Sequence, residues 1–180
     1  MAITKINADA MDLTDAYAFT GTVTGAGRIL QIVTADKTDT FTTTSTSFVD
    51  VTGLTVNITP ASSSNKILIL STINGSQGVG ANRTYFRLLR DSTAIFIGDA
   101  ASNRIRGSGS LSSADNSILS SPVVSTFLDS PSTTSQVTYK WQIILAAGSG
   151  TCYINRCGLD DDSTGQMRTA SNILVAEVAG

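Results

Sequence analysis

Three consecutive aspartates, Asp160, Asp161 and Asp162, form the only acidic cluster in the sequence. Carboxylate oxygens are ligands that Ca²⁺ prefers, and adjacent carboxylates repel one another unless a cation or water screens them. The run lacks the alternating ligand spacing of a calcium loop, so a hydrated turn is the better prediction. The three aspartates are therefore weak metal candidates, and we expect neither a metal site nor a cofactor.

A second set of candidate residues is basic. Arg83, Arg87 and Arg90 lie close to Tyr85 in a segment that is typical of a strand. Alternation places Tyr85 and Arg87 on one face of this strand and Arg90 on the other. Guanidinium groups beside a phenol suit a carbohydrate or phosphate ligand. The better prediction, however, is arginines at strand edges or in ion pairs between subunits.

Three further polar residues, Asn103, Arg104 and Arg106, fall within residues 98–117, which are rich in Gly, Ser, Asn and Ala. That composition predicts a long, exposed loop system. Exposed loops on a rigid scaffold are common places for ligand binding. If the protein contacts a receptor, we expect these three residues to face it.

Catalysis is disfavoured because the chain contains no histidine. Histidine is the commonest general base and metal ligand, and the usual partner of a Ser or Cys nucleophile. A disulfide between Cys152 and Cys157 would need a turn between them, so we expect two reduced, buried thiols. The Gly-rich run at residues 75–80 has no following lysine or helix, which argues against a phosphate loop. We expect a protein that is not an enzyme.

Charge and hydropathy limit the partners of the protein. Charged residues make up 14 % of the chain and the net charge is −2, which disfavours nucleic acids and anionic membrane surfaces. No run approaches the roughly 20 apolar residues of a transmembrane helix, and the first ten residues do not resemble a signal peptide. We expect synthesis and assembly in a cytoplasm, with no nucleic acid bound and no membrane insertion.

The elements that position these residues are predicted to be strands. Leu54, Val56 and Ile58 alternate with polar residues, which is the period of a half-buried strand, and Gly53 marks a bulge or bend. About eight or nine such runs, with no convincing helix among them, predict an all-β jelly-roll sandwich over residues 27–180. The runs are residues 28–33, 48–59, 66–73 (apolar on both faces, so deeply buried), 84–90, 93–97, 122–128, 136–145, 151–156 and 172–178, with turns at 74–78 and at Asp91-Ser92.

The first 26 residues have a different pattern. Ile3, Ile6, Ala10, Leu13 and Tyr17 follow the 3-4-3-4 spacing of one helix face. Two heptads are too short to be stable alone in water, so the stripe predicts contact with other chains or a larger body. A frayed tail with chance spacing is the alternative. The residues expected to make the attachment are Ile3, Ile6, Leu13, Tyr17 and Phe19.

Two stretches carry a resemblance to known proteins. Residues 11–25, MDLTDAYAFTGTVTG, resemble the N-terminal ends of small tail-fibre or virion proteins of tailed phages. Residues 42–60, TTTSTSFVDVTGLTVNITP, followed by SSSNKILIL at 62–70, resemble a recurrent domain of the same proteins, and YFRLLRD at 85–91 fits its pattern. The resemblance implies a trimeric jelly-roll head, similar to tumour-necrosis-factor-type heads, and an arm at residues 1–26 that docks to the particle.

On this resemblance we expect a phage virion structural protein, most simply a short tail fibre that adheres to the host surface. The alternative is a capsid decoration or cement protein whose arm clamps neighbouring capsid subunits. The implied partners are copies of the chain in a homotrimer, virion proteins of the tail, portal or capsid, and host surface polysaccharide. A trimer would suit residues 172–178, which are apolar on both faces around Glu177. A glycan-degrading tailspike would need paired carboxylates, and the remaining acids are scattered.

Overall fold

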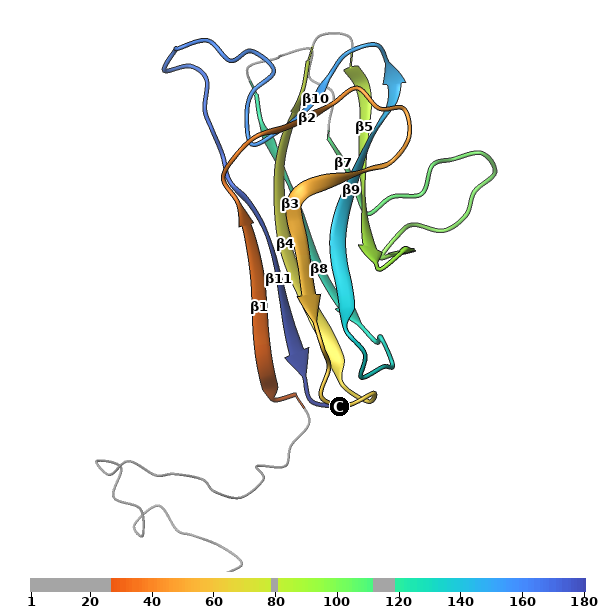
Figure 1. Ribbon diagram of the computed structural model, residues 1–180. Helices are drawn as coiled ribbons and strands as arrows, with labels where there is room; N and C mark the ends of the chain where they lie inside the picture. Colours follow the sequence, from red (N-terminus) through yellow and green to blue (C-terminus); the bar gives the residue numbers. More distant parts are fainter. Residues whose placement is uncertain (1–26, 79–80, 112–118) are drawn as a thin grey trace, which may run out of the picture.

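Two antiparallel β-sheets pack face to face to form the head (Figure 1). The computed structural model describes residues 27–78, 81–111 and 119–180. The strands are β1 (Ile29–Lys37), β2 (Phe41–Thr43), β3 (Val49–Ile58), β4 (Lys66–Gln77), β5 (Ala81–Arg90), β6 (Thr93–Ile95), β7 (Gly109–Leu111), β8 (Ser121–Asp129), β9 (Val137–Gly148), β10 (Cys152–Ile154) and β11 (Ser171–Val178).

The larger sheet has the order β1-β11-β4-β10-β2, with β8 also paired to β4. The smaller sheet has the order β3-β9-β5-β6, with β7 also paired to β5. No helix occurs in the three described ranges. The all-β jelly-roll sandwich predicted from the sequence is therefore confirmed.

The turn predicted at residues 74–78 is wrong, because β4 continues through Gln77. Residues 75–77 pair with β10, and Ser76 and Gln77 are buried. A Cβ on Gly75 would lie 3.1 Å from both the Leu111 side chain and the Tyr153 carbonyl. Glycine is needed at position 75 because β10 and the Leu111 side chain approach its backbone closely, and not because the chain reverses direction there.

The other turn signals have mixed outcomes. The hairpin at Asp91-Ser92 is confirmed, since β5 and β6 pair on either side of it and Asp91 has a φ of 54°. Gly53, with a φ of +86°, lies in the register shift between Asp50 and Thr55, which confirms the predicted bulge. The loop predicted over residues 98–117 is interrupted by the short strand β7.

The core lies between the two sheets and is built by alternation along the strands. Ile69 of β4 and Val175 of β11 face inward and are fully buried, as is Trp141 of the opposite sheet. Trp141 Nε1 donates to Ser71 Oγ at 2.9 Å, and Ser71 Oγ donates to the Asn172 carbonyl at 2.6 Å. This chain of hydrogen bonds joins the smaller sheet to β4 and β11 through the middle of the core.

Asn155, directly after β10, joins four strands of the larger sheet. Its side chain is fully buried, and its φ of 61° is a left-handed conformation that asparagine tolerates. Asn155 Nδ2 donates to the Lys37 carbonyl at 2.7 Å, and Oδ1 accepts from Ser171 Oγ at 2.6 Å. Its backbone amide donates to the Asn74 carbonyl at 2.9 Å. These bonds connect the ends of β1, β11 and β4 to β10.

The two ends of the sandwich carry different segments (Figure 1). At one end the chain enters the head beside its own C-terminus. The Gly27 amide donates to the Ala179 carbonyl at 3.0 Å, and the Ala179 amide donates to the Arg28 carbonyl at 2.8 Å. The strands β2 and β10 and the loop between β10 and β11 lie at the opposite end (Figure 1).

The outer face of the larger sheet carries rows of apolar side chains, interspersed with polar residues such as Thr34, Asp36 and Thr72. One row of side chains crosses four strands in register, since Ile32 pairs with Ala176, Ala176 with Leu68, and Leu68 with Leu128. Ile32, Leu70 and Leu128 are 57 %, 40 % and 47 % exposed, so β4 is not buried on both faces within one chain. We define the apolar face as Ile29, Ile32, Leu68, Leu70, Val124, Leu128, Leu174, Ala176 and Val178.

The outer face of the smaller sheet is polar. Asp50 accepts hydrogen bonds from Lys140 Nζ at 2.7 Å and from Gln142 Nε2 at 2.6 Å. Gln142 Oε1 accepts from Arg87 Nε at 2.8 Å, and the Arg87 guanidinium lies 3.9 Å from the centre of the Phe48 ring. These groups satisfy one another while they remain open to water, so this outer face needs no cover.

The buried carboxylate of Glu177, on β11, ties three segments together. Oε1 accepts from Asn65 Nδ2 at 2.5 Å and from the Ala61 amide at 2.6 Å, and Oε2 accepts from Gln31 Nε2 at 2.6 Å. Burial raises the pKa of this carboxyl, but these hydrogen bonds outweigh burial and hold the pKa below its ordinary value. The charged side chain thus fixes the turn between β3 and β4 to β1 and β11.

Replacing Glu177 with Gln is expected to lower the free energy of unfolding at neutral pH by about 1–3 kcal/mol, because an amide cannot accept all three hydrogen bonds. Since the folded-state pKa lies below the ordinary value of 4.5, the wild-type advantage is present above that pH. It is lost as the pH falls through the folded-state pKa, so the two proteins converge in acid. Urea unfolding followed by tryptophan fluorescence, from neutral pH to about pH 3, measures this convergence.

The control for this prediction is Asp162→Asn, which neutralises an exposed carboxylate in the loop between β10 and β11. It is expected to change the free energy of unfolding by less than about 0.5 kcal/mol. An equal loss of stability in both variants would contradict the role given to Glu177.

Candidate functional site

A groove on the outer side of the smaller sheet brings together residues that are far apart in the sequence. Arg83 and Tyr85 come from β5, and Asn103, Arg104 and Ile105 come from the loop between β6 and β7. With Ala146 of β9 they line a hollow of about 570 Å³. This loop projects beside β5 in Figure 1, and we call the hollow the β5 groove.

The loop lies against β5 because both of its ends are paired to that strand. β6 pairs with residues 88–90 of β5 and β7 pairs with residues 84–86. The Ser108 amide donates to the Phe86 carbonyl at 2.8 Å, and Ser108 Oγ accepts from the Leu88 amide at 3.0 Å. A Cβ on Gly107 would lie 2.8 Å from the Phe86 carbonyl oxygen, so glycine is required where the loop returns.

The loop is also closed by its own hydrogen bonds. Arg106 Nε donates to the Gly98 carbonyl at 2.6 Å, and the Gly98 amide contacts the Gly107 carbonyl at 3.4 Å. The Arg104 amide donates to the Ala101 carbonyl at 3.1 Å. These bonds give the groove a defined wall instead of a loose segment.

The β5 groove is positively charged. Within the described residues, the Arg83 side chain makes no hydrogen bond or ion pair. The Arg104 side chain makes one hydrogen bond within the same residues, from Nη1 to the Ala101 carbonyl at 3.5 Å. No carboxylate of the described residues lines the groove, and Asp99 of the same loop is not among its described lining residues. Arginine stays charged at every physiological pH, so two uncompensated guanidinium groups share the groove with a phenol and an amide.

A second hollow continues the groove along β5. It has a volume of about 280 Å³, shares Tyr85 and Ile105 with the β5 groove, and extends to Ser108 and Ser110. Arg106, which the sequence groups with Asn103 and Arg104, lines a separate hollow beside Phe96. The predicted receptor-facing set is therefore divided, and only Asn103 and Arg104 lie in the β5 groove.

The other two arginines of β5 are engaged elsewhere. Arg87 lies on the same strand face as Tyr85 but is occupied by Gln142 and the Phe48 ring. Arg90 lies on the opposite face, where its Nη1 is 2.9 Å from Asp129 Oδ1. That ion pair is formed within the chain, so Arg90 is not free for a partner subunit.

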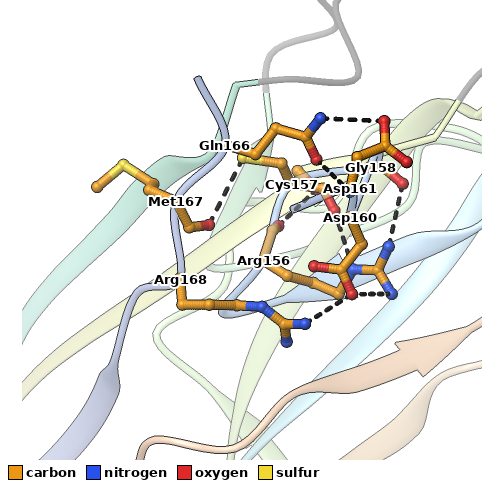
Figure 2. A network of polar contacts seen from close by, with 9 residues as sticks. Arg156, Cys157, Gly158, Asp160, Asp161, Gln166, Met167 and Arg168 are labelled. Atoms are coloured by element: carbon orange, nitrogen blue, oxygen red, sulfur yellow. Dashed lines mark hydrogen bonds and ion pairs between the residues drawn. The ribbon is translucent and has the colours of Figure 1, made fainter. Parts of the chain in front are cut away.

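The guanidinium groups of Arg156 and Arg168 both form ion pairs with Asp160, the first residue of the acidic run (Figure 2). Asp160 Oδ2 lies 2.6 Å from Arg168 Nη2 and 3.3 Å from Arg156 Nη1. Asp161 and Gln166 exchange hydrogen bonds, with the Asp161 amide donating at 2.8 Å and Gln166 Nε2 donating at 3.3 Å. Across the described residues, no group of three or more His, Cys, Asp or Glu side chains is arranged to hold a metal ion.

Cys152 and Cys157 are buried thiols that form no disulfide, as the sequence predicts. Cys152 Sγ lies 2.9 Å from Thr84 Oγ1, and Cys157 Sγ contacts the Met167 carbonyl at 3.6 Å. Burial raises the pKa of Cys152, although the contact with Thr84 opposes it. A buried thiol with a raised pKa is a poor nucleophile, so Cys152 serves packing.

The arm residues Ile3, Ile6, Leu13, Tyr17 and Phe19 lie outside the described residues, so the attachment role of the arm stays a prediction. In the described part of the chain, no helix is long and apolar enough to cross a membrane. No protein-family model matches the chain, and no curated protein matches it. The resemblance to tail-fibre proteins in residues 11–25, 42–60, 62–70 and 85–91 therefore stays a prediction.

Ellman's reagent is expected to react slowly with both thiols of the folded protein and to reveal two thiols only after denaturation, because Cys152 and Cys157 are buried. Absorbance of the released thiolate against time measures both phases. Ser63→Cys, at an exposed loop position, is the matched control and should add one rapidly reacting thiol. Rapid reaction of Cys152 or Cys157 in the native protein would contradict the structural role.

Proposed function

We propose that the protein is a structural component of a tailed-phage virion, and within that class a short tail fibre that holds the particle to its host. The observation that carries this proposal is the contrast between the two outer faces of the head. The apolar face lies on the larger sheet, and the β5 groove lies on the smaller sheet, on the opposite side of the sandwich. One side thus suits assembly and the other suits display.

The apolar face supports self-association. Val124 is 68 % exposed and Ile32 57 % exposed, and the row from Ile32 to Leu128 spans four strands. Exposed apolar side chains gathered on one sheet face are characteristic of protein–protein interfaces. We propose that two further copies of the chain cover it. The choice of a trimer follows the resemblance to fibre heads, and closed symmetry buries the face without leaving it open to further growth.

The position of residue 27 at one end of the head supports an arm at residues 1–26 that attaches to the particle. Residue 27 enters beside the C-terminus, at the end of the sandwich opposite β2 and β10 (Figure 1). In a trimer built on the apolar face, three arms would leave from one end while three grooves face outward. Three weak contacts to a repetitive surface would then give a much higher overall affinity than one contact alone.

Light scattering is expected to give the full-length wild-type protein the mass of three 18.7 kDa chains. Leu70→Lys should give monomers with an unchanged circular dichroism spectrum, because a charge on the apolar face cannot be buried against another copy without a large desolvation cost. Thr55→Lys, an exposed change on the smaller sheet, is the matched control and should remain trimeric. A wild-type protein that stays monomeric at micromolar concentration would overturn the trimer.

Removal of residues 1–26 is expected to abolish incorporation into particles while the head still folds. Full-length Ile6→Asp and Leu13→Asp variants should reduce incorporation in the same way, because each places a charge in the apolar stripe. Immunoblots of purified particles measure incorporation, and persistence of the truncated protein in them would contradict the arm. Normal adsorption by fragile particles that lack the protein would favour the decoration or cement alternative over the fibre.

A further inference from the structure

We infer that the β5 groove binds an acidic saccharide, with Arg83 and Arg104 paired to a sugar carboxylate and Tyr85 against the sugar ring. This inference rests on the proposed adhesive function and names the class of ligand that the head would recognise. It requires three properties of the groove: charge without an internal counter-ion, a partly apolar floor, and room for more than one sugar unit.

Three other arginines of the head are paired with carboxylates. Arg90 pairs with Asp129, and Arg156 and Arg168 share Asp160. In the described ranges Arg83 has no such partner. Fixed guanidinium groups with no acid beside them attract an anion from solution, and the planar fork of arginine matches a carboxylate with two parallel hydrogen bonds.

The shape of the groove favours a saccharide over a small inorganic anion. Its volume of about 570 Å³ falls in the range of sites that hold organic ligands of moderate size. Tyr85 and Ile105 line both this groove and the adjoining hollow of about 280 Å³, so an aromatic and an aliphatic side chain contribute to the lining of both hollows. Such a lining suits the C–H face of a sugar ring, and Asn103 and Ser110 supply partners for hydroxyl groups.

Nucleic acid fits this groove poorly. Polynucleotide binding depends on many phosphate contacts along an extended basic track. Among the described residues that line the groove, Arg83 and Arg104 are the cations and no lysine occurs, and the chain as a whole carries a net charge of −2. A polymer with one carboxylate per sugar unit or per repeat matches this charge density better than a polyphosphate does.

The test measures binding of the full-length protein to oligogalacturonate, hyaluronate oligomers and alginate oligomers by isothermal titration calorimetry. Each ligand has a carboxyl-reduced form, which keeps the sugar ring and removes the charge. We expect the wild-type protein to bind at least one uronic-acid ligand and not its reduced form. Arg83→Gln and Arg104→Gln should each weaken that binding by on the order of tenfold, because each removes one charge-assisted hydrogen-bonding group.

Lys66→Gln is the matched control, since it removes one positive charge from an exposed position on the larger sheet, away from the groove. It is expected to leave the affinity unchanged, and thermal unfolding should show that all three variants are folded. The inference is overturned if no uronic-acid ligand binds or if Lys66→Gln weakens binding as much as Arg83→Gln. It is also overturned if inorganic phosphate or sulfate competes at equal concentration of anionic groups, since the site would then recognise charge alone.

The binding assay also separates this inference from the proposed function, because it needs no particle. Uronate binding by a protein that never enters virions would refute the fibre and leave the groove assignment intact. Normal incorporation and normal adsorption by particles that carry Arg83→Gln and Arg104→Gln together would refute the groove assignment and leave the fibre intact.

Discussion

The alternation of side chains along β4 is the constraint on which the rest of the head depends. β4 pairs with β11, β10 and β8, so its pleat sets the register of most of the larger sheet. Ile67, Ile69 and Ile73 point into the core, while Leu68 and Leu70 point outward. A shift of one residue would exchange these two sets, and it would bring Lys66 and Thr72 into the core. The core and the apolar face are thus two results of one register.

Buried polar groups hold that register in place. Asn155 bonds to backbone groups at the ends of β1 and β4, and Glu177 fixes the turn that precedes β4. Between them, Ser71 links Trp141 of the smaller sheet to β11. Each of these groups is expensive to bury unless its partners are correctly placed, so each penalises alternative pairings of the strands more than a purely apolar contact would. The strands β5 and β9, which contribute to the lining of the β5 groove, belong to the smaller sheet that Trp141 joins to this network.

The strands were predictable wherever the sequence alternates. The polar residues of the groove were also identified from the sequence, but that they share one groove was not predictable. Leu54, Val56 and Ile58 show a clear period of two, and Asp91-Ser92 has ordinary turn chemistry, so both gave correct predictions. The groove depends instead on β7, a three-residue strand of Gly, Ser and Leu with too little pattern to recognise. Only the pairing of β7 with β5 brings Arg104 beside Arg83. The failed turn at residues 74–78 has a related cause, because Gly75 signals a turn locally and is needed for close packing at long range.

The junction of the two termini has a mechanical consequence. The chain passes from residue 27 directly into β1, and β1 is antiparallel to β11 along its whole length. Tension applied through residue 27 therefore runs along the axis of β1 and loads its hydrogen bonds to β11 together, in shear, instead of opening them one after another. Strand pairs loaded in this direction yield only when many bonds break at once. A head tethered at residue 27 would accordingly resist a pull from its attachment point better than its modest size suggests.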